Sequence, residues 1–596
     1  MTYPNLLDRW ASQVRLRGHN PALVTPDRVW TYRELAGLAG GLRRDLAAAP
    51  DGAVLVACED RALTTAAILA CASLGRAFAP VDRGQPAARL AAMAEQLRPA
   101  VVLSDGAGPP AGAASVAGPS GIGPVHLTAE TTAEGPWPAS TGTAPDAGYV
   151  YFTSGTTGRP KGIAGSLAAV AHFVEWEIAE FGVGPHSRVS MLTSPGFDAF
   201  LRDALLPLCA GGSAHVPGEV PVGDGLLDWL EEQRISVLHC VPTLWRTMRA
   251  AAPGPDRLPQ LRAVLLAGEA VRPSDVEWWH AGPGRRVPLI NLYGPSETTM
   301  TKVFRRLTAE DAAGPVVPVG RPMPGVEVRV LVAGRPVVDQ IGEVEIKTPF
   351  RLGGYLDGYT GGFAGPYRYR TGDLGRLRPG GDLEILGRRD QQVKVNGVRV
   401  ELGEVEDVLR RHPAVTDVCA ALVEEAGSDP LLCAYVVAGE VGEETLRSHA
   451  AAALPQAHRP ALYVRLAALP RTLSGKVDRR RLPSPAAARA ADRTHEPNAG
   501  LEAEIAAIWV ELLGLPSVGR RDDFALLGGD SLRTARLLDR MRARFGVDVP
   551  LRVFVTDPTV AGLATAVAAA PGAAQHPPDG AGYPPGDTGR DATGRR

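Results

Sequence analysis

Residues 149–163 join a short apolar strand to a loop suited to holding phosphate. They read Tyr-Val-Tyr-Phe-Thr-Ser-Gly-Thr-Thr-Gly-Arg-Pro-Lys-Gly-Ile. Small side chains, many N–H groups and the cation Lys161 make a phosphate chain the expected ligand. A Walker loop is excluded, because it needs Gly, four residues, Gly-Lys and then Ser or Thr. Here Gly155 and Gly158 lie too close together, and Gly162 follows the lysine.

Further strings along the chain carry a family resemblance. Residues 291–299 read Asn-Leu-Tyr-Gly-Pro-Ser-Glu-Thr-Thr, and residues 369–374 read Tyr-Arg-Thr-Gly-Asp-Leu. Together with the 149–163 loop, and with stretches at 387–401 and 473–479, they resemble the motifs of AMP-forming adenylating enzymes, in the order found in that family. These enzymes activate a carboxylate as its acyl adenylate. A lone Gly/Ser/Thr loop is a weak signal, whereas several extended motifs in order are specific.

The C-terminal part resembles a second module. Residues 526–532 read Leu-Leu-Gly-Gly-Asp-Ser-Leu and follow Asp522-Asp523-Phe524, which looks like the attachment signature of a peptidyl carrier protein. Ser531 would then carry 4'-phosphopantetheine, installed by a separate phosphopantetheinyl transferase. Alternatively, Ser531 only caps a helix. An esterase of the Gly-Asp-Ser-Leu type is disfavoured, because the serine lies in a short helical module. The whole chain thus resembles a nonribosomal peptide synthetase adenylation domain fused to a carrier protein.

The resemblance assigns roles at the ATP site. The phosphate loop comprises Thr153, Ser154, Gly155, Thr156, Thr157 and Gly158. Lys161 is expected to neutralise the departing pyrophosphate. Tyr293, followed by Gly294, is expected to stack on adenine, and Glu297 to bind Mg²⁺, which takes carboxylate and phosphate oxygens. Asp373 matches the ribose-binding aspartate, and Arg388 is expected to add a sugar or phosphate contact. The alternatives are a glycine-rich turn with a solvated lysine, and an aspartate that caps a turn.

Catalysis and lobe movement are also implied. Lys476 matches the lysine that bridges the attacking carboxylate and the phosphorus centre, with Thr153 and Glu297 as the other catalytic residues. A cation stabilises the charge that develops there; the alternative is one more surface lysine near a basic run. Asp390 matches the interlobe hinge, where a few residues absorb large dihedral changes. Lys394 and Gly397 belong to the face expected to serve the thiol step.

The resemblance also places an amino-acid pocket. Asp198 matches the aspartate that binds the α-ammonium group, and a buried carboxylate needs such a cationic partner. The other expected pocket positions are Ala199, Arg202, His239, Leu265, Ala267, Leu292, Met300 and Thr301. Arg202 could bind a side-chain carboxylate with His239 beside it, which favours an acidic or strongly polar α-amino acid such as glutamate. In the alternative, Arg202 points to solvent or pairs with Asp203, and the pocket is aliphatic.

The elements that must position these residues predict an α/β multi-domain fold. Apolar runs alternate with amphipathic helical stretches up to about residue 386, and strands are expected at 149–152, 263–266 and 287–292. Hairpin signals follow at 419–423 and 432–437, and a helix begins near 501. The fold class is a large lobe with parallel or mixed sheets and helices, a small α+β lobe, and an all-α four-helix carrier domain. The expected parts are 1–388, 389–483, a linker at 484–500, a carrier at 501–570, and a disordered tail at 571–596.

Composition excludes several classes. The 63 Lys and Arg nearly balance the 65 Asp and Glu, so the charge favours neither nucleic acid nor an anionic membrane as a partner. The six cysteines form no CxxC pair, which argues against a disulfide framework or a zinc site. The first residues lack the apolar core of a signal peptide, and no run is long enough to cross a bilayer. A cytoplasmic location is therefore expected.

Three functions stay open. The leading hypothesis is a ligase that uses ATP and Mg²⁺ to activate an L-α-amino acid and loads its own carrier domain, for nonribosomal peptide or related metabolism. No condensation or thioesterase motif is found, so downstream condensation or tailoring enzymes are expected partners, with an MbtH-like activator as a further one. An acyl- or aryl-CoA ligase and a degenerate scaffold domain are the alternatives. The sequence does not name the amino acid, the acceptor, the product or the oligomeric state.

Overall fold

The computed structural model describes most of the chain in two compact units, Met1–Ala488 and Arg489–Arg596. The described residues are 5–105, 125–128, 137, 148–153, 160–251, 254, 257–389, 392–395, 397–423, 430–439, 441–471, 477–485, 496–513, 517–522, 524, 527, 531–547, 549, 554 and 558–568. The tail at 571–596, which the sequence predicts to be disordered, lies outside them, as do Asp390 and Lys476. The predicted α/β multi-domain class is confirmed.

The largest sheet of the first unit has nine strands in the described residues. Their order is β15 (Arg321–Pro322), β14 (Val303–Leu307), β13 (Leu289–Tyr293), β12 (Ala263–Leu266), β11 (Val237–Cys240), β9 (Arg188–Ser190), β10 (Ser213–His215), β1 (Pro21–Val24) and β2 (Val29–Thr31). The strands from β13 to β1 run parallel, and β14, β15 and β2 pair antiparallel. The carboxyl ends of β11, β12 and β13 therefore meet at one sheet edge, where ligands of such sheets bind.

A second sheet carries the predicted phosphate loop. Its order is β19 (Gly354–Tyr355), β8 (Lys161–Ser166), β7 (Gly148–Thr153), β4 (Phe78–Pro80), β3 (Val54–Ala57), β5 (Val101–Ser104) and β6 (Val125–Thr128). Residues of both sheets enter one buried cluster, including Val56 and Tyr149 from this sheet and Leu265 and Ile290 from the first. The two sheets therefore share one core.

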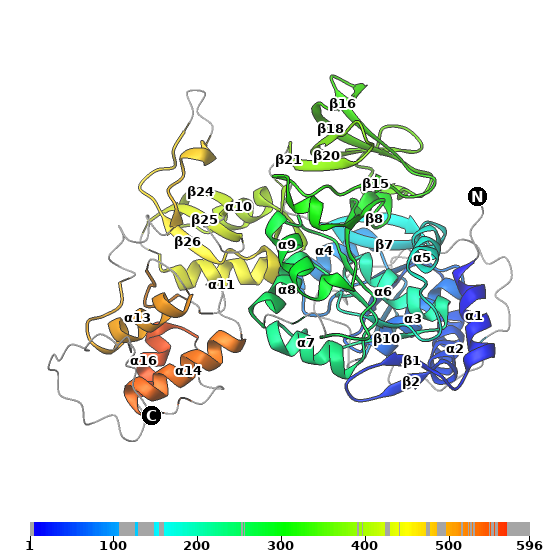
Figure 1. Ribbon diagram of the computed structural model, residues 1–596, viewed down its shortest axis with the longest axis horizontal. Coiled ribbons are helices and arrows are strands. Elements are labelled where there is room, and N and C mark those ends of the chain that lie inside the picture. Colours follow the sequence, from blue (N-terminus) through cyan, green and yellow to red (C-terminus); the bar gives the residue numbers. More distant parts are fainter. Residues whose placement is uncertain are drawn as a thin grey trace, which may run out of the picture. The chain divides into compact units, whose positions relative to one another are not determined.

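Helices cover these sheets. They are α1 (Leu6–Arg17), α2 (Tyr32–Ala48), α3 (Arg61–Ser73), α4 (Ala87–Leu97), α5 (Leu167–Phe181), α6 (Ala199–Ala210), α7 (Gly223–Glu232), α8 (Pro242–Arg246) and α9 (Pro273–Ala281). Figure 1 shows α1 and α2 beside β1 and β2, and these helices contact each other. Local sequence fixes their starts: α2 begins with a capping box in which Thr31 and Glu34 satisfy each other's backbone N–H groups.

The alternation expected up to residue 386 ends earlier in the structure. Five antiparallel strands follow instead, in the order β17 (Arg335–Val337), β16 (Glu327–Val332), β18 (Ile341–Lys347), β20 (Arg368–Leu377) and β21 (Leu383–Arg388). They form the green sheet at the top of Figure 1. Buried and exposed residues alternate along β20, and left-handed glycines stand in the hairpin turns at Gly334 and Gly381. Such turns favour hairpins over helical crossovers.

The small lobe has its own core. Its strands are β22 (Gln392–Val395), β23 (Val398–Glu401), β24 (Val415–Val423), β25 (Leu431–Ala438) and β26 (Leu462–Arg465), with α10 (Leu402–Arg410) and α11 (Glu443–Ala453). Strands β22 and β23 form a hairpin, and β24, β25 and β26 form a sheet. Val405, Leu409 and Leu446 are among the residues buried between the helices and the strands.

The second unit is helical in its described residues. It contains α13 (Leu501–Leu513), α14 (Ser531–Phe545) and α16 (Val560–Ala568), which pack around Trp509, Phe524 and Leu563. Short 3₁₀ turns elsewhere are Thr247–Ala251, Pro283–Arg285, Ser296–Thr298, Ala309–Ala312, Gln456–His458 and Arg479–Arg481. Among the described helices, none has the length and apolar character required to cross a bilayer.

Candidate active site

The two ends of the predicted phosphate loop lie side by side. Strands β7 and β8 are antiparallel partners, and Thr153 is opposite Lys161 at the end of the ladder. The ammonium of Lys161 lies 3.7 Å from the centre of the Tyr359 ring, within the range of a cation–π contact. The predicted loop residues Ser154, Gly155, Thr156, Thr157 and Gly158 lie outside the described residues.

Three predicted nucleotide-binding residues converge from different strands. The Tyr293 hydroxyl at the end of β13 donates to Asp373 Oδ2 at 2.5 Å, and Arg388 Nη1 donates to Asp373 Oδ1 at 2.7 Å. Asp373 on β20 is the register partner of Arg388 on β21. Burial, with the Asp373 charge adding to it, raises the pKa of Tyr293 well above its ordinary value. The hydroxyl therefore stays protonated and remains a donor.

A tight loop joins this group to the next predicted residue, Glu297. A Cβ at Gly294 would lie only 2.7 Å from the Met300 carbonyl oxygen, so only glycine fits this close approach. Thr299 and Met300 both have left-handed backbone, with φ of 62° and 58°. This folds the loop back, and Lys302 N then donates to Tyr293 O at 2.8 Å.

Glu297 is fully buried and charged. The Tyr355 hydroxyl and Arg399 Nη1 donate to its Oε1 at 2.7 and 2.8 Å. Burial alone would raise the pKa of Glu297, but the Arg399 charge, aided by the hydrogen bond from Tyr355, lowers it. The other oxygen, Oε2, is buried and has no partner of normal hydrogen-bond geometry among the described residues, although Tyr369 lies close enough to interact with the carboxylate.

The Arg399 contact brings the small lobe to the site. Its hairpin β22–β23 turns at Gly397, which has φ of 77°, and a Cβ there would lie 2.3 Å from Val241 Cγ1. A Cβ at Gly268 would in turn lie 3.4 Å from Gly397 Cα. Lys394 on β22 stays exposed but interacts with the charge of Asp373. The predicted hinge Asp390 and the predicted catalytic Lys476 lie outside the described residues.

The residues predicted to line an amino-acid pocket lie on α6, on three neighbouring strands and in the loop after β13. Asp198, just before α6, accepts a hydrogen bond from Met300 N at 3.3 Å. Burial raises the pKa of Asp198 despite this bond. His239, Leu265 and Leu292 occupy the neighbouring strands β11, β12 and β13, and they are almost fully buried. Of the remaining predicted residues, Ala199 begins α6, Ala267 follows β12, and Met300 and Thr301 are buried in the loop after β13.

The alternative arrangement for Arg202 is the one observed. Arg202 is buried, and its Nε donates to Asp203 Oδ1 at 2.9 Å. His239 Nε2 lies 2.5 Å from Glu177 Oε1 on α5, and His239 Nδ1 lies 3.3 Å from Asp203 Oδ1. The guanidinium is thus paired inside the protein.

Electrostatics balance this buried cluster. Burial and the Arg202 charge would lower the pKa of His239, but Glu177 and Asp203 raise it, so the imidazolium is favoured. Burial would raise the pKa of Asp203, yet Arg202 and His239 bring it to about 2. Two cations therefore face two carboxylates, as buried charges require.

Sequence reasoning missed Glu177 and Lys302. Glu177 lies on the buried face of α5, and Lys302 is fully buried, donating from Nζ to Thr299 O at 2.6 Å. Burial lowers the pKa of Lys302 to about 7, against the opposing charge of Asp198. The only available signal was a charged residue within an otherwise apolar segment, and that signal does not reveal its partner.

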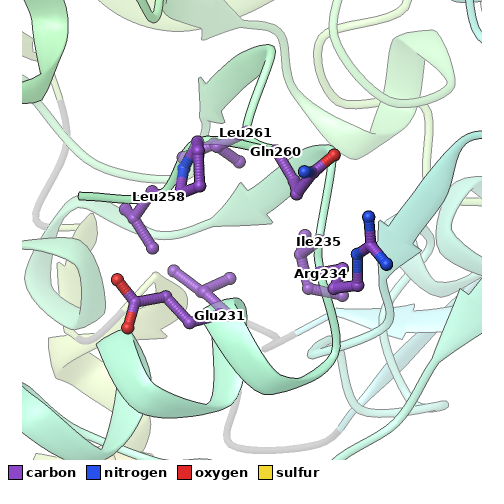
Figure 2. Close-up of a pocket in the computed structure, with 8 residues that line it drawn as sticks. Glu231, Arg234, Ile235, Leu258, Gln260 and Leu261 are labelled. Carbon is purple, nitrogen blue, oxygen red and sulfur yellow. The ribbon is translucent and has the colours of Figure 1, made fainter. Parts of the chain in front are cut away.

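A separate surface pocket holds none of the predicted residues. Figure 2 shows this cavity, of about 340 Å³, between the end of α7 with the turn after it and residues 258–261 before β12. Leu230, Ile235, Leu258 and Leu261 line it together with Glu231 and Arg234. In the second unit, Ser531 is the first residue of α14.

Family comparisons match these units. Residues 10–356 match the AMP-binding enzyme family, 404–476 its C-terminal domain, and 503–567 the phosphopantetheine attachment site. The chain belongs to the AMP-binding enzymes. The predicted fusion of an AMP-binding region to a carrier domain is confirmed, and this AMP-binding enzyme has the adenylation and carrier architecture of nonribosomal peptide synthetases.

Relatives of this AMP-binding enzyme differ greatly in length. It is 35% identical over 595 residues to a probable non-canonical nonribosomal peptide synthetase CymA of Salinispora arenicola (strain CNS-205), covering 94% of this chain but 7% of that protein. It is 34% identical to novobiocin biosynthesis protein H of Streptomyces niveus, covering 94% and 95%. A solved structure of holo-PA1221, an NRPS protein containing adenylation and PCP domains, matches with a TM-score of 0.76 and 26% identity, covering 94% and 96%.

Proposed function

We propose that the chain activates an α-amino acid as its aminoacyl adenylate and passes the acyl group to a thiol on its own carrier domain. Two observations support this proposal most: Tyr293, Asp373 and Arg388 form one hydrogen-bonded group, and Glu297 is bonded to Tyr355 on β19, which pairs with strand β8 after the phosphate loop. In the first step a carboxylate oxygen attacks the α-phosphorus of ATP, and pyrophosphate leaves. In the second a sulfur attacks the acyl carbon, and AMP leaves.

The residues present fit a nucleotide. Both oxygens of Asp373 are held in place by Tyr293 and Arg388, so the carboxylate is fixed before ribose hydroxyls arrive. Lys161 stands at the loop end, where a polyphosphate would replace the Tyr359 ring as its partner. Lys476 remains the proposed bridging cation, and Asp390 the proposed hinge.

Glu297 also fits Mg²⁺ through the buried oxygen Oε2, which accepts no hydrogen bond of normal geometry from the described residues. A carboxylate with phosphate oxygens and water satisfies this ion, whose charge would be supplied to the reacting phosphates. The ion would have to share the carboxylate with Arg399 in the observed arrangement. We therefore assign Mg²⁺ to the adenylation step, with the small lobe turned away.

The observed lobe position supports a role in the thiol step. The β22–β23 hairpin lies at the site, with Arg399 on Glu297 and Gly397 against Val241. Ser531 starts a helix in the unit matched to phosphopantetheine attachment, and that group supplies the accepting thiol when it is present. Its installation requires a phosphopantetheinyl transferase, and the loaded acyl group requires a downstream condensation or tailoring enzyme. An MbtH-like protein is a further proposed partner.

The substrate we propose has an uncharged side chain, with its α-ammonium on Asp198. The earlier expectation of an acidic side chain depended on an available Arg202, but this guanidinium is committed to Asp203. An incoming carboxylate would have to compete with Asp203 inside a cluster whose charges already balance. Thr301 Oγ1 is buried without a hydrogen-bond partner among the described residues, which leaves a polar contact for an uncharged side chain.

Amino-acid-dependent exchange of labelled pyrophosphate into ATP tests this function. A panel should show activity with a neutral amino acid and little with aspartate or glutamate. Intact mass of the pantetheinylated chain should then show an aminoacyl adduct that is absent in Ser531→Ala. A strong preference for glutamate would overturn the neutral side chain, and a requirement for free coenzyme A would favour an acyl-CoA ligase.

A further inference from the structure

A buried ionic cluster lies away from the nucleotide site. Arg89 Nη1 on α4 donates to Glu404 Oε1 on α10 at 2.6 Å, and Glu404 Oε2 lies 3.1 Å from His458 Nδ1. The exposed fractions are 7% for Arg89, 1% for Glu404 and 3% for His458. Both oxygens of one carboxylate are therefore occupied out of contact with solvent.

The residues of this ionic cluster come from both lobes. Arg89 belongs to the large lobe, whereas Glu404 and His458 belong to the small lobe, and α11 of the small lobe packs against α4. Glu404 lies five residues after Arg399, which reaches Glu297 at the active site. The small lobe thus forms ion pairs with the large lobe both in the site and outside it.

The same helix also supports the phosphate-loop strand. Gln96, near the end of α4, donates to Pro160 O and accepts from Gly162 N at 3.0 Å. The apolar side of α4 packs through Leu90, Met93 and Leu97 into a buried cluster with β3, β4 and β5. These contacts hold α4 in the large lobe without help from Arg89.

Arg89 and Glu404 differ in the partners that they would keep if the small lobe moved. If the small lobe turns, Glu404 keeps His458, because both move together. Arg89 loses its carboxylate, and its Nε already has no hydrogen-bond partner among the described residues. Turning the lobe away would return Arg89 and Glu404 to water, whereas forming the pair buries both charges. The close Arg89–Glu404 contact and the His458 bond to the other oxygen offset that desolvation, and this pairing is specific to the lobe arrangement seen here.

We propose that Arg89 is a positioning residue for the thiol step, which latches the small lobe through Glu404 so that the β22–β23 hairpin stays at the active site. The inference rests on the proposed two-step function and extends it. Arg89 touches no substrate; it acts by holding α10, and α10 holds the preceding strand β23. Adenylation, which uses the other lobe position, does not need this contact.

The test measures the two half-reactions separately on the full pantetheinylated chain. Pyrophosphate exchange reports adenylation, and single-turnover acylation of Ser531-bound pantetheine from preformed adenylate reports the thiol step. Arg89→Ala should leave exchange within about twofold of the unchanged chain and slow acylation about tenfold or more. Arg89→Lys, which keeps the charge, should restore most of the acylation rate.

Two further variants separate positioning from folding. Glu404→Gln keeps a side chain that can hydrogen-bond His458 and should repeat the selective loss of acylation. Arg83→Ala removes a partly buried pair with Asp105 inside the large lobe and should affect neither half-reaction. Equal loss of both half-reactions in Arg89→Ala, or acylation at the unchanged rate, would overturn the latch. An unsubstituted chain without amino-acid-dependent exchange would instead overturn the proposed function, and the latch with it.

Discussion

At the scale of single residues, opposite charges decide the arrangement of the site. Glu297 is buried, yet it stays ionised because Arg399 pairs with it. Asp373 is held by Arg388, and Asp203 by Arg202. Each carboxylate is paired with an arginine. If the arginine is removed, the buried carboxylate keeps its desolvation cost without the compensating attraction, which destabilises the folded state.

Asp373→Asn tests the nucleotide site. The amide still accepts a hydrogen bond from Tyr293, but it loses the charge that pairs with Arg388 and that we propose binds the ribose hydroxyls. The KM for ATP in pyrophosphate exchange should rise about tenfold or more. Asp382→Asn is the matched control, because Asp382 pairs with Arg305 at the far end of the same sheet. Equal KM values for both variants would contradict the ribose assignment.

Arg202→Met tests the buried cluster through stability. Removal of this cation leaves Asp203, Glu177 and His239 unbalanced, so the free energy of unfolding should fall by about 3–5 kcal/mol. Arg306→Met breaks an exposed pair with Glu180 and should cost about 0–1 kcal/mol. Urea unfolding followed by tryptophan fluorescence measures both. A small loss in Arg202→Met would show that the cluster is not a stabilising unit.

The sequence predicted residue types better than residue partners. Tyr293, Asp373 and Arg388 were expected in one site, and the structure brings them together because β13, β20 and β21 meet there. Arg202 was expected either to face the substrate or to pair with Asp203, and in the structure it pairs with Asp203. Glu177 could not have been found, because its helix α5 reaches His239 only in three dimensions.

At the scale of elements, the β22–β23 hairpin carries the small lobe into the site. Hairpins at 419–423 and 432–437 were predicted from apolar runs, and they are part of β24 and β25. The antiparallel sheet that follows β15 was missed, because its short apolar runs resemble those of an α/β unit. Only the closely spaced glycine turns distinguish an antiparallel sheet from an α/β unit in this segment, since a helical crossover needs a longer connection.

Gly397→Ala tests the hairpin. A methyl group would strike Val241, and the left-handed backbone adds strain, so the turn must withdraw from the large lobe. Acylation of the carrier should fall at least about tenfold while pyrophosphate exchange persists. Gly381→Ala carries the backbone cost without the clash, in the β20–β21 turn, and should spare both steps. Normal acylation in Gly397→Ala would remove the hairpin from the thiol step.

At the scale of the whole molecule, buried neutral histidines set a lower pH limit for stability. Burial lowers the pKa of both His172 and His215 from 6.5 to about 4. The unfolded chain therefore binds protons more strongly than the folded one below pH 6.5. The stability that these histidines contribute is complete above that pH, and it is lost as the pH falls toward 4.

The pH dependence is measurable. By pH 5, each of these histidines should reduce the free energy of unfolding by about 2 kcal/mol. The thermal midpoint should drop between pH 7.5 and 5, and His215→Gln should flatten that drop. His186→Gln, at an exposed position, should not change it. An identical pH profile for His215→Gln and the unsubstituted chain would contradict the assignment.

Helix α4 contacts two parts of the molecule that the proposed function uses in turn. Arg89 and Gln96 are seven residues apart, so about 10 Å of rigid helix separates the small-lobe contact from the strand that leaves the phosphate loop. One helix therefore contacts both the small lobe and the start of strand β8. If the small lobe leaves α4 in the proposed adenylation step, the amides of α4 should exchange faster with solvent, and hydrogen exchange with and without ATP measures this.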